Sequence, residues 1–258
     1  MSKSPDALEK EAYSFLSENN FEEAFKLFGK AAKEYSKNDD HKQATLCFAS
    51  AASCWNKKYE EKTFHNAAVS YENAAREAEK YGDFEYASLL YKHAAINHER
   101  DVEFLKYSNC FYRSKECYRK FLNYRLVRPG RIHSIAKIAE PKGLAGFIKR
   151  TFLWIITTFS FIIWGHGERP ARTFSSGILI VLISSFFYVF GQLSKDGFVF
   201  KPGFFEAFYF SVVTFTTVGY GDITPLGFCK LVAAIEAFSG LFIMSLFVVG
   251  LSRKYLRI

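Results

Sequence analysis

The segment Thr216-Thr217-Val218-Gly219-Tyr220-Gly221-Asp222 decides the fold of the C-terminal half of this chain. Its two glycines can adopt a positive φ without the steric penalty that a Cβ brings. The segment follows an apolar stretch, 203–215, which is compatible with a helix and too short to cross a bilayer. The sequence therefore predicts a short helix followed by irregular backbone at residues 216–222.

Two longer apolar stretches flank this segment. Residues 173–194 carry no charge, and residues 231–252 carry a single charge, that of Glu236. At a rise of about 1.5 Å per residue, each stretch is long enough to cross a hydrocarbon core of about 30 Å as a helix. Irregular backbone at membrane depth is tolerated only where it lines a cavity or is buried in protein. The pattern predicts two spans, 173–194 and 230–252, around a re-entrant pore helix at 203–216.

The segment from Thr216 to Asp222 resembles the selectivity filter of potassium channels, which also lies between a short pore helix and a second span. In such filters carbonyl oxygens replace the water shell of K⁺, and four chains supply them around a common axis. Because one chain supplies one filter strand and one pore helix, the resemblance implies a homotetramer. It covers residues 165–258 and implies a two-span, potassium-selective channel. K⁺ is then the permeant ion, no cofactor is needed, and the protein is not an enzyme.

The resemblance also implies which residues bind the ion. The Thr217 hydroxyl is expected to complete the innermost K⁺ site, and Tyr220 favours K⁺ over Na⁺. The side chains of Val218 and Tyr220 are expected to turn outward and pack against the pore helix. The coordinating carbonyls are expected to come from Thr217, Val218, Gly219 and Tyr220.

A second set of residues is expected to support the filter. Asp222 matches the acid at the outer mouth of such channels, and the positions that match its usual partners on the pore helix hold Tyr209 and Val213. Because valine cannot form a hydrogen bond, we predict a bond between Tyr209 and Asp222. The supporting set is Gly221, Asp222, Tyr209 and Thr216.

Two residues of the second span are candidate functional residues. Gly240 is expected either to act as a hinge that opens a cytoplasmic gate or, with Ser239, to allow close helix packing. Glu236 is an acid within a span, which is costly unless the carboxyl group is paired. We expect Glu236 to bond with a pore-helix hydroxyl, that of Ser211 or Thr214, rather than to bind ions.

The N-terminal half repeats a helical pattern. Large apolar residues recur at helical spacing around small residues, which are alternately 20 and 23 residues apart: Ala24, Ala44, Ala67, Ala87 and Cys110. This period predicts stacked helical hairpins, with turns at 38–40 and 82–83. Over residues 6–122 the spacing resembles tetratricopeptide-like arrays, particularly those of soluble NSF attachment proteins. Such a domain either binds a protein or small-ligand partner or only folds and holds subunits together.

The net charge of +8 is concentrated before the membrane half. Residues 113–150 hold eleven Lys and Arg against two acids. Because this block abuts the apolar half, it is expected at the anionic surface of a lipid bilayer and not on nucleic acid. The polar N-terminus, Ser2 to Lys10, shows no signal-peptide pattern. Residues 1–150 and the basic C-terminus, with Arg253 and Lys254, are therefore expected in the cytoplasm of an integral, multi-pass protein, with the cell membrane as its location.

A third apolar stretch, 151–164, lies in the length range of interfacial segments. If it crossed the membrane, the basic C-terminus would finish outside, so we predict a helix in the plane of the cytoplasmic face. The chain is then all-α, with a helical-repeat domain at 1–125, a basic linker and interfacial helix at 126–172, and a pore domain at 173–258 whose filter is 217–222.

Alternatives to this interpretation remain open at the level of sequence. The protein could be a weakly selective cation channel, or a membrane-anchored helical-repeat adaptor with a vestigial pore. An enzyme is disfavoured because no His, Cys or carboxylate set stands at catalytic spacing. The five cysteines form no CxxC pair, and those in Ala-rich helices are expected to act as small apolar residues and not as metal ligands. The repeat domain is a candidate controller of the gate.

Overall fold

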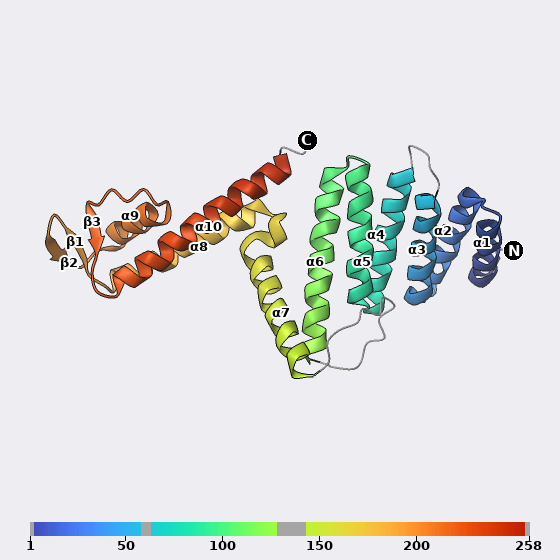
Figure 1. Ribbon diagram of the computed structural model, residues 1–258, viewed down its shortest axis with the longest axis horizontal. Coiled ribbons are helices and arrows are strands. Elements are labelled where there is room, and N and C mark those ends of the chain that lie inside the picture. The colour runs from blue at the N-terminus through green and yellow to red at the C-terminus, as the bar shows by residue number, and fades with distance from the viewer. Residues whose placement is uncertain (1–2, 58–62, 128–142, 256–258) are drawn as a thin grey trace. The chain divides into compact units, whose positions relative to one another are not determined.

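The computed structural model of the chain describes residues 3–57, 63–127 and 143–255 (Figure 1). Of the residues that the structure describes, 81% are helical, in agreement with the predicted all-α class. It divides into two compact units, Met1–Phe159 and Ser160–Ile258. The boundary falls within a helix, whereas the sequence placed boundaries at 125 and 172. Most of the predicted basic linker, residues 128–142, lies outside the described residues.

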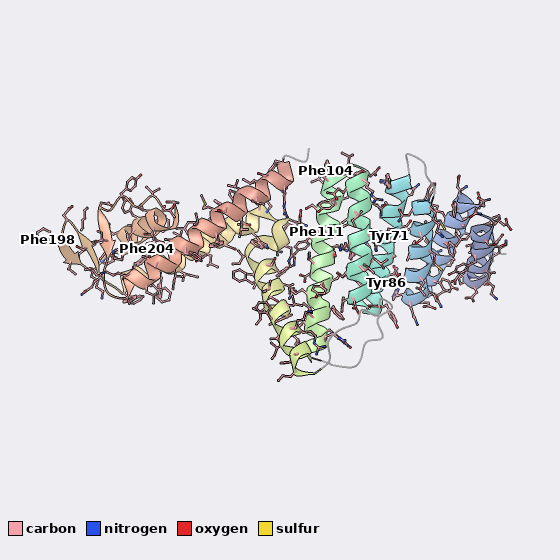
Figure 2. All side chains as sticks on the ribbon, in the orientation of Figure 1. Tyr71, Tyr86, Phe104, Phe111, Phe198 and Phe204 are labelled. Atoms are coloured by element: carbon pink, nitrogen blue, oxygen red, sulfur yellow. The ribbon has the colours of Figure 1, made fainter. Side chains whose placement is uncertain are left out.

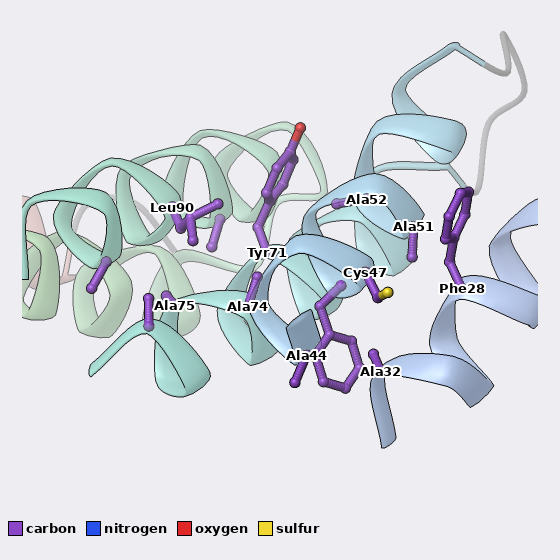
Figure 3. Close-up of a cluster of buried hydrophobic side chains, with 14 of the residues drawn as sticks. Phe28, Ala32, Ala44, Cys47, Ala51, Ala52, Tyr71, Ala74, Ala75 and Leu90 are labelled. Carbon is purple, nitrogen blue, oxygen red and sulfur yellow. The ribbon is translucent and has the colours of Figure 1, made fainter. Parts of the chain in front are cut away.

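In the described residues from 3 to 127, six helices follow one another, and each packs against the next along the chain (Figure 1). They are α1 (Pro5–Ser17), α2 (Phe21–Lys37), α3 (His41–Lys57), α4 (Thr63–Tyr81), α5 (Phe84–Arg100) and α6 (Phe104–Val127). The small residues that the sequence spaced regularly are all buried, at 2% exposure or less. Because they lack bulk, neighbouring helices can approach closely around the larger side chains of Phe28, Tyr71 and Leu90 (Figure 3).

The four turns between these helices that lie within the described residues repeat one local geometry. In each of the four, a residue with positive φ follows the helix, and the N–H of the next residue donates to the carbonyl five residues back, at 2.9–3.0 Å. This closes the free carbonyls at the helix end. The positive-φ residues are Asn19, Asp39, Gly82 and Val102. Both predicted turns are among them, and the repeat of this turn agrees with the period seen in the sequence.

The second unit contains two long helices, α8 (Pro170–Val189) and α10 (Cys229–Tyr255), and a short one, α9 (Phe204–Phe215). All three pack against one another. Gly250 of α10 lies beside Pro170, the first residue of α8, and Cys229 of α10 lies beside Gly191, just after α8. The two long helices are therefore antiparallel, as two successive membrane spans would be.

The first predicted span, 173–194, is wrong at its C-terminal end, because α8 stops at Val189. At Gly191 a Cβ would overlap the Cys229 sulfur, so this close approach requires glycine as the chain leaves the helix. The chain then forms β1 (Leu193–Lys195). The second span also differs slightly, since α10 extends three residues beyond the predicted end at 252.

Three short strands form a sheet that the sequence analysis did not predict. β1 pairs antiparallel with β2 (Phe198–Phe200) and with β3 (Ile223–Pro225). Asp196 and Gly197, both with positive φ, form the two-residue turn between β1 and β2. An Asp-Gly pair is favoured in two-residue hairpin turns, so the sequence did contain a signal for this hairpin. The exposed side chain of Phe198 projects from this hairpin (Figure 2).

Helix α7 spans Leu144–Trp164 and is followed by a single 3₁₀ turn, Gly165–Gly167. It is longer than the uncharged stretch 151–164, because it also includes the preceding turns with Lys149 and Arg150. Among the described residues, three helical segments are long and apolar enough to cross a membrane: Leu144–Gly167, Pro170–Val189 and Cys229–Tyr255. Length alone therefore does not exclude a crossing by α7.

Candidate functional site

The segment from Thr216 to Asp222 lies between α9 and β3. The chain enters α9 from β2, and Gly203 caps the helix while its N–H donates to Glu206 Oε2 at 2.6 Å. After α9, residues 216–222 lead back to β3. Because β2 and β3 both pair with β1, the segment begins and ends at the same small sheet. At 12 residues and about 1.5 Å per residue, α9 is too short to cross a bilayer core.

The backbone after α9 alternates in sign of φ. Thr217, Gly219 and Gly221 have φ of +58°, +57° and +79°, and the residues between them do not have positive φ. Positive φ at both glycines agrees with the sequence analysis, which did not foresee the same conformation at Thr217. A threonine with positive φ is strained, and such strain persists only where the surrounding structure holds it.

Hydrogen bonds to the last turn of α9 hold Thr217 in its strained conformation at the start of the segment. The Thr217 N–H donates to the Thr214 carbonyl at 3.0 Å, and the Val218 N–H donates to the Val213 carbonyl at 3.1 Å. The Thr216 hydroxyl donates to the Val212 carbonyl at 2.7 Å. The carbonyls that would otherwise end α9 unpaired therefore fix the direction in which the segment leaves the helix.

Asp222 is tied to α9 at the far end of the segment. The Tyr209 hydroxyl donates to Asp222 Oδ2 at 3.0 Å. This is the contact that the sequence analysis predicted from the absence of a hydrogen-bonding group at Val213. With the bonds at Thr217 and Val218, it attaches both ends of the segment to the same helix.

Replacing Tyr209 with phenylalanine is expected to shift the segment away from its described conformation. A single hydrogen bond contributes about 0.5–1.5 kcal/mol, so the population shift should be roughly two- to tenfold. If the segment is an ion filter, as its resemblance implies, single-channel recording should show the shift as a lower fraction of time in the conducting state and altered inactivation. An unchanged conducting fraction and unchanged inactivation would mean that the bond has no part in holding the segment.

The side chains of Val218 and Tyr220 do not pack against the helix of their own chain as expected. Their exposed fractions are 53% and 72%, and all residues from Thr216 to Asp222 are exposed in the single chain. At this exposure nothing within the single chain covers these two side chains.

Glu236 joins the three helices of the second unit. Its side chain is buried at 1% exposure, it accepts a hydrogen bond from the Tyr188 hydroxyl at 2.6 Å, and its other carboxyl oxygen contacts the Ser211 hydroxyl. Of the two predicted partners, Ser211 and Thr214, the structure brings Ser211 to Glu236. Tyr188 on α8 was missed, although a tyrosine within an apolar span is a signal that its hydroxyl needs a partner.

Gly240 lies where α10 approaches the end of α9 most closely. A Cβ at this position would overlap the Phe215 carbonyl oxygen and would lie 2.9 Å from the carbonyl carbon. Helix α10 continues without interruption through this residue. The geometry therefore favours close packing, the second of the two roles expected for Gly240.

Basic residues gather where α7 meets α8. The Arg172 side chain donates to the Phe161 carbonyl at 3.1 Å, and the Ser176 hydroxyl donates to the Ile163 carbonyl at 3.1 Å, so the end of α7 is attached to the start of α8. A Cβ at Gly167 would lie 3.3 Å from the Arg253 guanidinium. This junction and the C-terminal end of α10 therefore lie together.

The chain was compared with known protein families. A family model described as "Ion channel" matches residues 176–257, which include most of α8, all of α9, the segment after it and all of α10. The match and the apolar helices together define an ion channel domain in this part of a membrane protein. They favour a channel over an enzyme. No match was found among curated proteins, and none among solved structures.

Proposed function

We propose that this protein is the subunit of a homotetrameric, potassium-selective channel that conducts K⁺ passively across a membrane. The observation that carries the proposal is the backbone of Thr217–Gly221, whose φ alternates in sign directly after a short apolar helix. Successive carbonyls of such a backbone can face a common side, which is what replacement of the hydration shell of K⁺ requires. The K⁺ ligands in this proposal are the carbonyls of Thr217, Val218, Gly219 and Tyr220, with the Thr217 hydroxyl.

The exposure of the filter segment supports assembly of several copies. One chain provides a single filter strand, and the side chains of Val218 and Tyr220 lack cover within that chain. In a fourfold assembly a neighbouring subunit would cover these side chains, and four strands would surround one ion path. Polar backbone at membrane depth would then line a cavity, as its hydration requires.

Charge supports an orientation with both termini in the cytoplasm. Arg169 and Arg172 at the start of α8 lie at the same end of the unit as Arg253 and Lys254 of α10. Basic residues at span ends favour the cytoplasmic face. If the N-terminal unit is cytoplasmic too, α7 begins and ends on one face and lies in the plane of the membrane.

The orientation can be measured with epitope tags placed before Met1 and after Ile258. Both tags are expected to be accessible from the cytoplasmic face of sealed membrane vesicles and protected in vesicles of the opposite orientation. Accessibility of the two tags from opposite faces would mean that α7 crosses the membrane, and the predicted interfacial helix would be wrong.

The function itself is tested by single-channel recording of the purified full-length protein in planar bilayers. In a K⁺/Na⁺ gradient the reversal potential is expected to lie close to the K⁺ equilibrium potential. A reversal potential near zero would indicate the alternative of a weakly selective cation channel. An absence of K⁺ flux in all conditions tested would favour the alternative of an anchored adaptor with a vestigial pore.

The N-terminal unit is proposed to be a tetratricopeptide-like domain that controls the gate. Its repeated turns and its buried small residues support the repeat architecture. A truncated chain that begins near residue 142 is expected to keep K⁺ selectivity and to change its open probability. Equal open probability in the truncated and full-length proteins would leave the domain with a role in partner binding or assembly instead.

A further inference from the structure

Three potential metal ligands meet inside the N-terminal unit, far along the chain from the filter. Glu72 comes from α4, His98 from α5 and Cys110 from α6, and one ligand atom of each lies within 4.8 Å of the others. The three helices are consecutive neighbours in the stack (Figure 1). The five cysteines form no CxxC pair, so the sequence did not predict a metal site. The spacing of residues along the chain does not show which ligands from three separate helices will meet.

His98 is the observation that points to a ligand. Its side chain is fully buried, at 0% exposure, and neither ring nitrogen has a hydrogen-bond partner. The nearest acidic atom is Glu72 Oε2, 3.7 Å from Nε2, which is beyond hydrogen-bond distance. An imidazole buried without partners is costly, and buried polar groups in native proteins are nearly always satisfied. A metal ion between these side chains would supply the missing interaction.

Cys110 provides a sulfur ligand at the same place. Its side chain is buried, at 2% exposure, and its sulfur lies within 4.8 Å of a ligand atom of Glu72 and of His98. Metal binding would replace the thiol proton, which would leave to solvent. Among the described residues, Cys110 is the only cysteine that lies in a cluster of potential metal ligands.

We propose that Glu72, His98 and Cys110 bind one divalent transition-metal ion, and that Zn²⁺ is the ion they suit best. Carboxylate, imidazole and thiolate are the ligands that Zn²⁺ takes in proteins, usually in tetrahedral geometry. Three protein ligands leave the fourth position for water or another molecule. A metal here would cross-link α4, α5 and α6.

Arg76 is the group that competes with the metal. It bonds Glu72 Oε1, which leaves Oε2 on the side of His98. Because the Arg76 side chain is 52% exposed, it can turn into solvent when a cation binds. Replacing Arg76 with glutamine is therefore expected to raise the affinity for metal.

A second group of ligand type lies nearby and is distinct. It consists of His65, Asp101 and Glu103, and the rings of His65 and His98 are 6.5 Å apart. His65 Nδ1 already bonds Asp101 Oδ2 at 3.0 Å, and none of the three side chains is fully buried. It contains no sulfur, so an optical signal from a metal–thiolate bond can separate the two groups.

The test is titration of the full-length protein, purified without a polyhistidine tag, with Co²⁺ as an optical substitute for Zn²⁺. The wild type is expected to develop thiolate-to-cobalt absorption that saturates at one Co²⁺ per chain and is abolished by Zn²⁺. This result needs no variant, so it does not depend on whether a variant folds. An absence of the thiolate absorption on titration would overturn the proposal.

Variants then assign the ligands. His98→Asn and Cys110→Ser are expected to lose more than about tenfold in Zn²⁺ affinity, since even changes to groups behind the ligands cost 10–100-fold. Cys117→Ser is the matched control, because Cys117 is equally buried on the same helix and belongs to neither group. It should bind Zn²⁺ as the wild type does. Loss of the thiolate absorption in Cys117→Ser, with retention in Cys110→Ser, would refute the assignment. Helix content measured by circular dichroism shows that each variant is folded.

Discussion

Replacing Gly219 with alanine is expected to reduce K⁺ flux by more than about 100-fold. Gly219 has a φ of +57°, and an L-residue in this region costs about 1–2 kcal/mol. In the proposed tetramer the penalty applies four times around one ion path, which gives about 4–8 kcal/mol. If the backbone relaxed to negative φ, the adjoining carbonyls would turn away from the ion. Flux of K⁺ into liposomes that contain the purified protein measures the effect.

Gly197 supplies the matched control for this substitution. It has a φ of +84° in the turn between β1 and β2, and a Cβ at either Gly197 or Gly219 would meet nothing within 4 Å. Alanine therefore introduces the same backbone strain at both positions without a collision. Gly197→Ala is expected to conduct much as the wild type does. If both variants conducted equally, residues 217–221 would not form the ion path.

Replacing Gly240 with alanine is expected to weaken assembly of the pore and to abolish selective flux. The new methyl group would overlap the Phe215 carbonyl, which is backbone and cannot rotate away. Overpacking of this kind costs about 1–3 kcal/mol in each chain, and relief requires α9 to move away from α10. Because the proposed filter leaves directly from the end of α9, this movement would also displace Thr217. Thermal stability of the purified protein and its K⁺/Na⁺ reversal potential are the two measurements.

Gly250→Ala is the control on the same helix. Its Cβ would lie 3.5 Å from the Pro170 side chain, an ordinary contact distance. Both substitutions give α10 the same gain in helix propensity, about 1 kcal/mol, so a difference between them reports the contact with Phe215. If Gly240→Ala kept stability and selectivity and lowered only the open probability, Gly240 would be a hinge and the packing role would be wrong.

Local features of the sequence were sufficient for much of the pore segment. The positive φ of Gly219 and Gly221 follows from the absence of a Cβ, and the apolar length of 203–215 limits α9 to a helix too short to cross a membrane. The bond from Tyr209 to Asp222 could be predicted because the resemblance to potassium channels gives two partner positions on the helix, Tyr209 and Val213, and valine cannot form a hydrogen bond. The repeated turns at Asp39 and Gly82 are also encoded locally.

Sequence-based predictions were wrong where the end of a helix or the position of a strand depends on residues far away in the chain. Residues 190–194 are uncharged, like most of the helix before them, but the chain leaves α8 where Gly191 packs against Cys229. The same applies to β1, whose partners β2 and β3 stand on either side of α9 in the sequence. Apolar periodicity carries no information about such pairings.

The sequence by itself determined the helical class, the short helix with its glycine-rich exit, and the regular spacing of small residues in the first unit. Each of these depends on residues within a few turns of one another. Only the tertiary structure decided that Tyr188 and Ser211 meet Glu236, that Gly240 lies against Phe215, and that Glu72, His98 and Cys110 meet inside the helical stack. These contacts join residues of separate helices, and which of them meet is fixed by how the helices pack and not by the local pattern of either one.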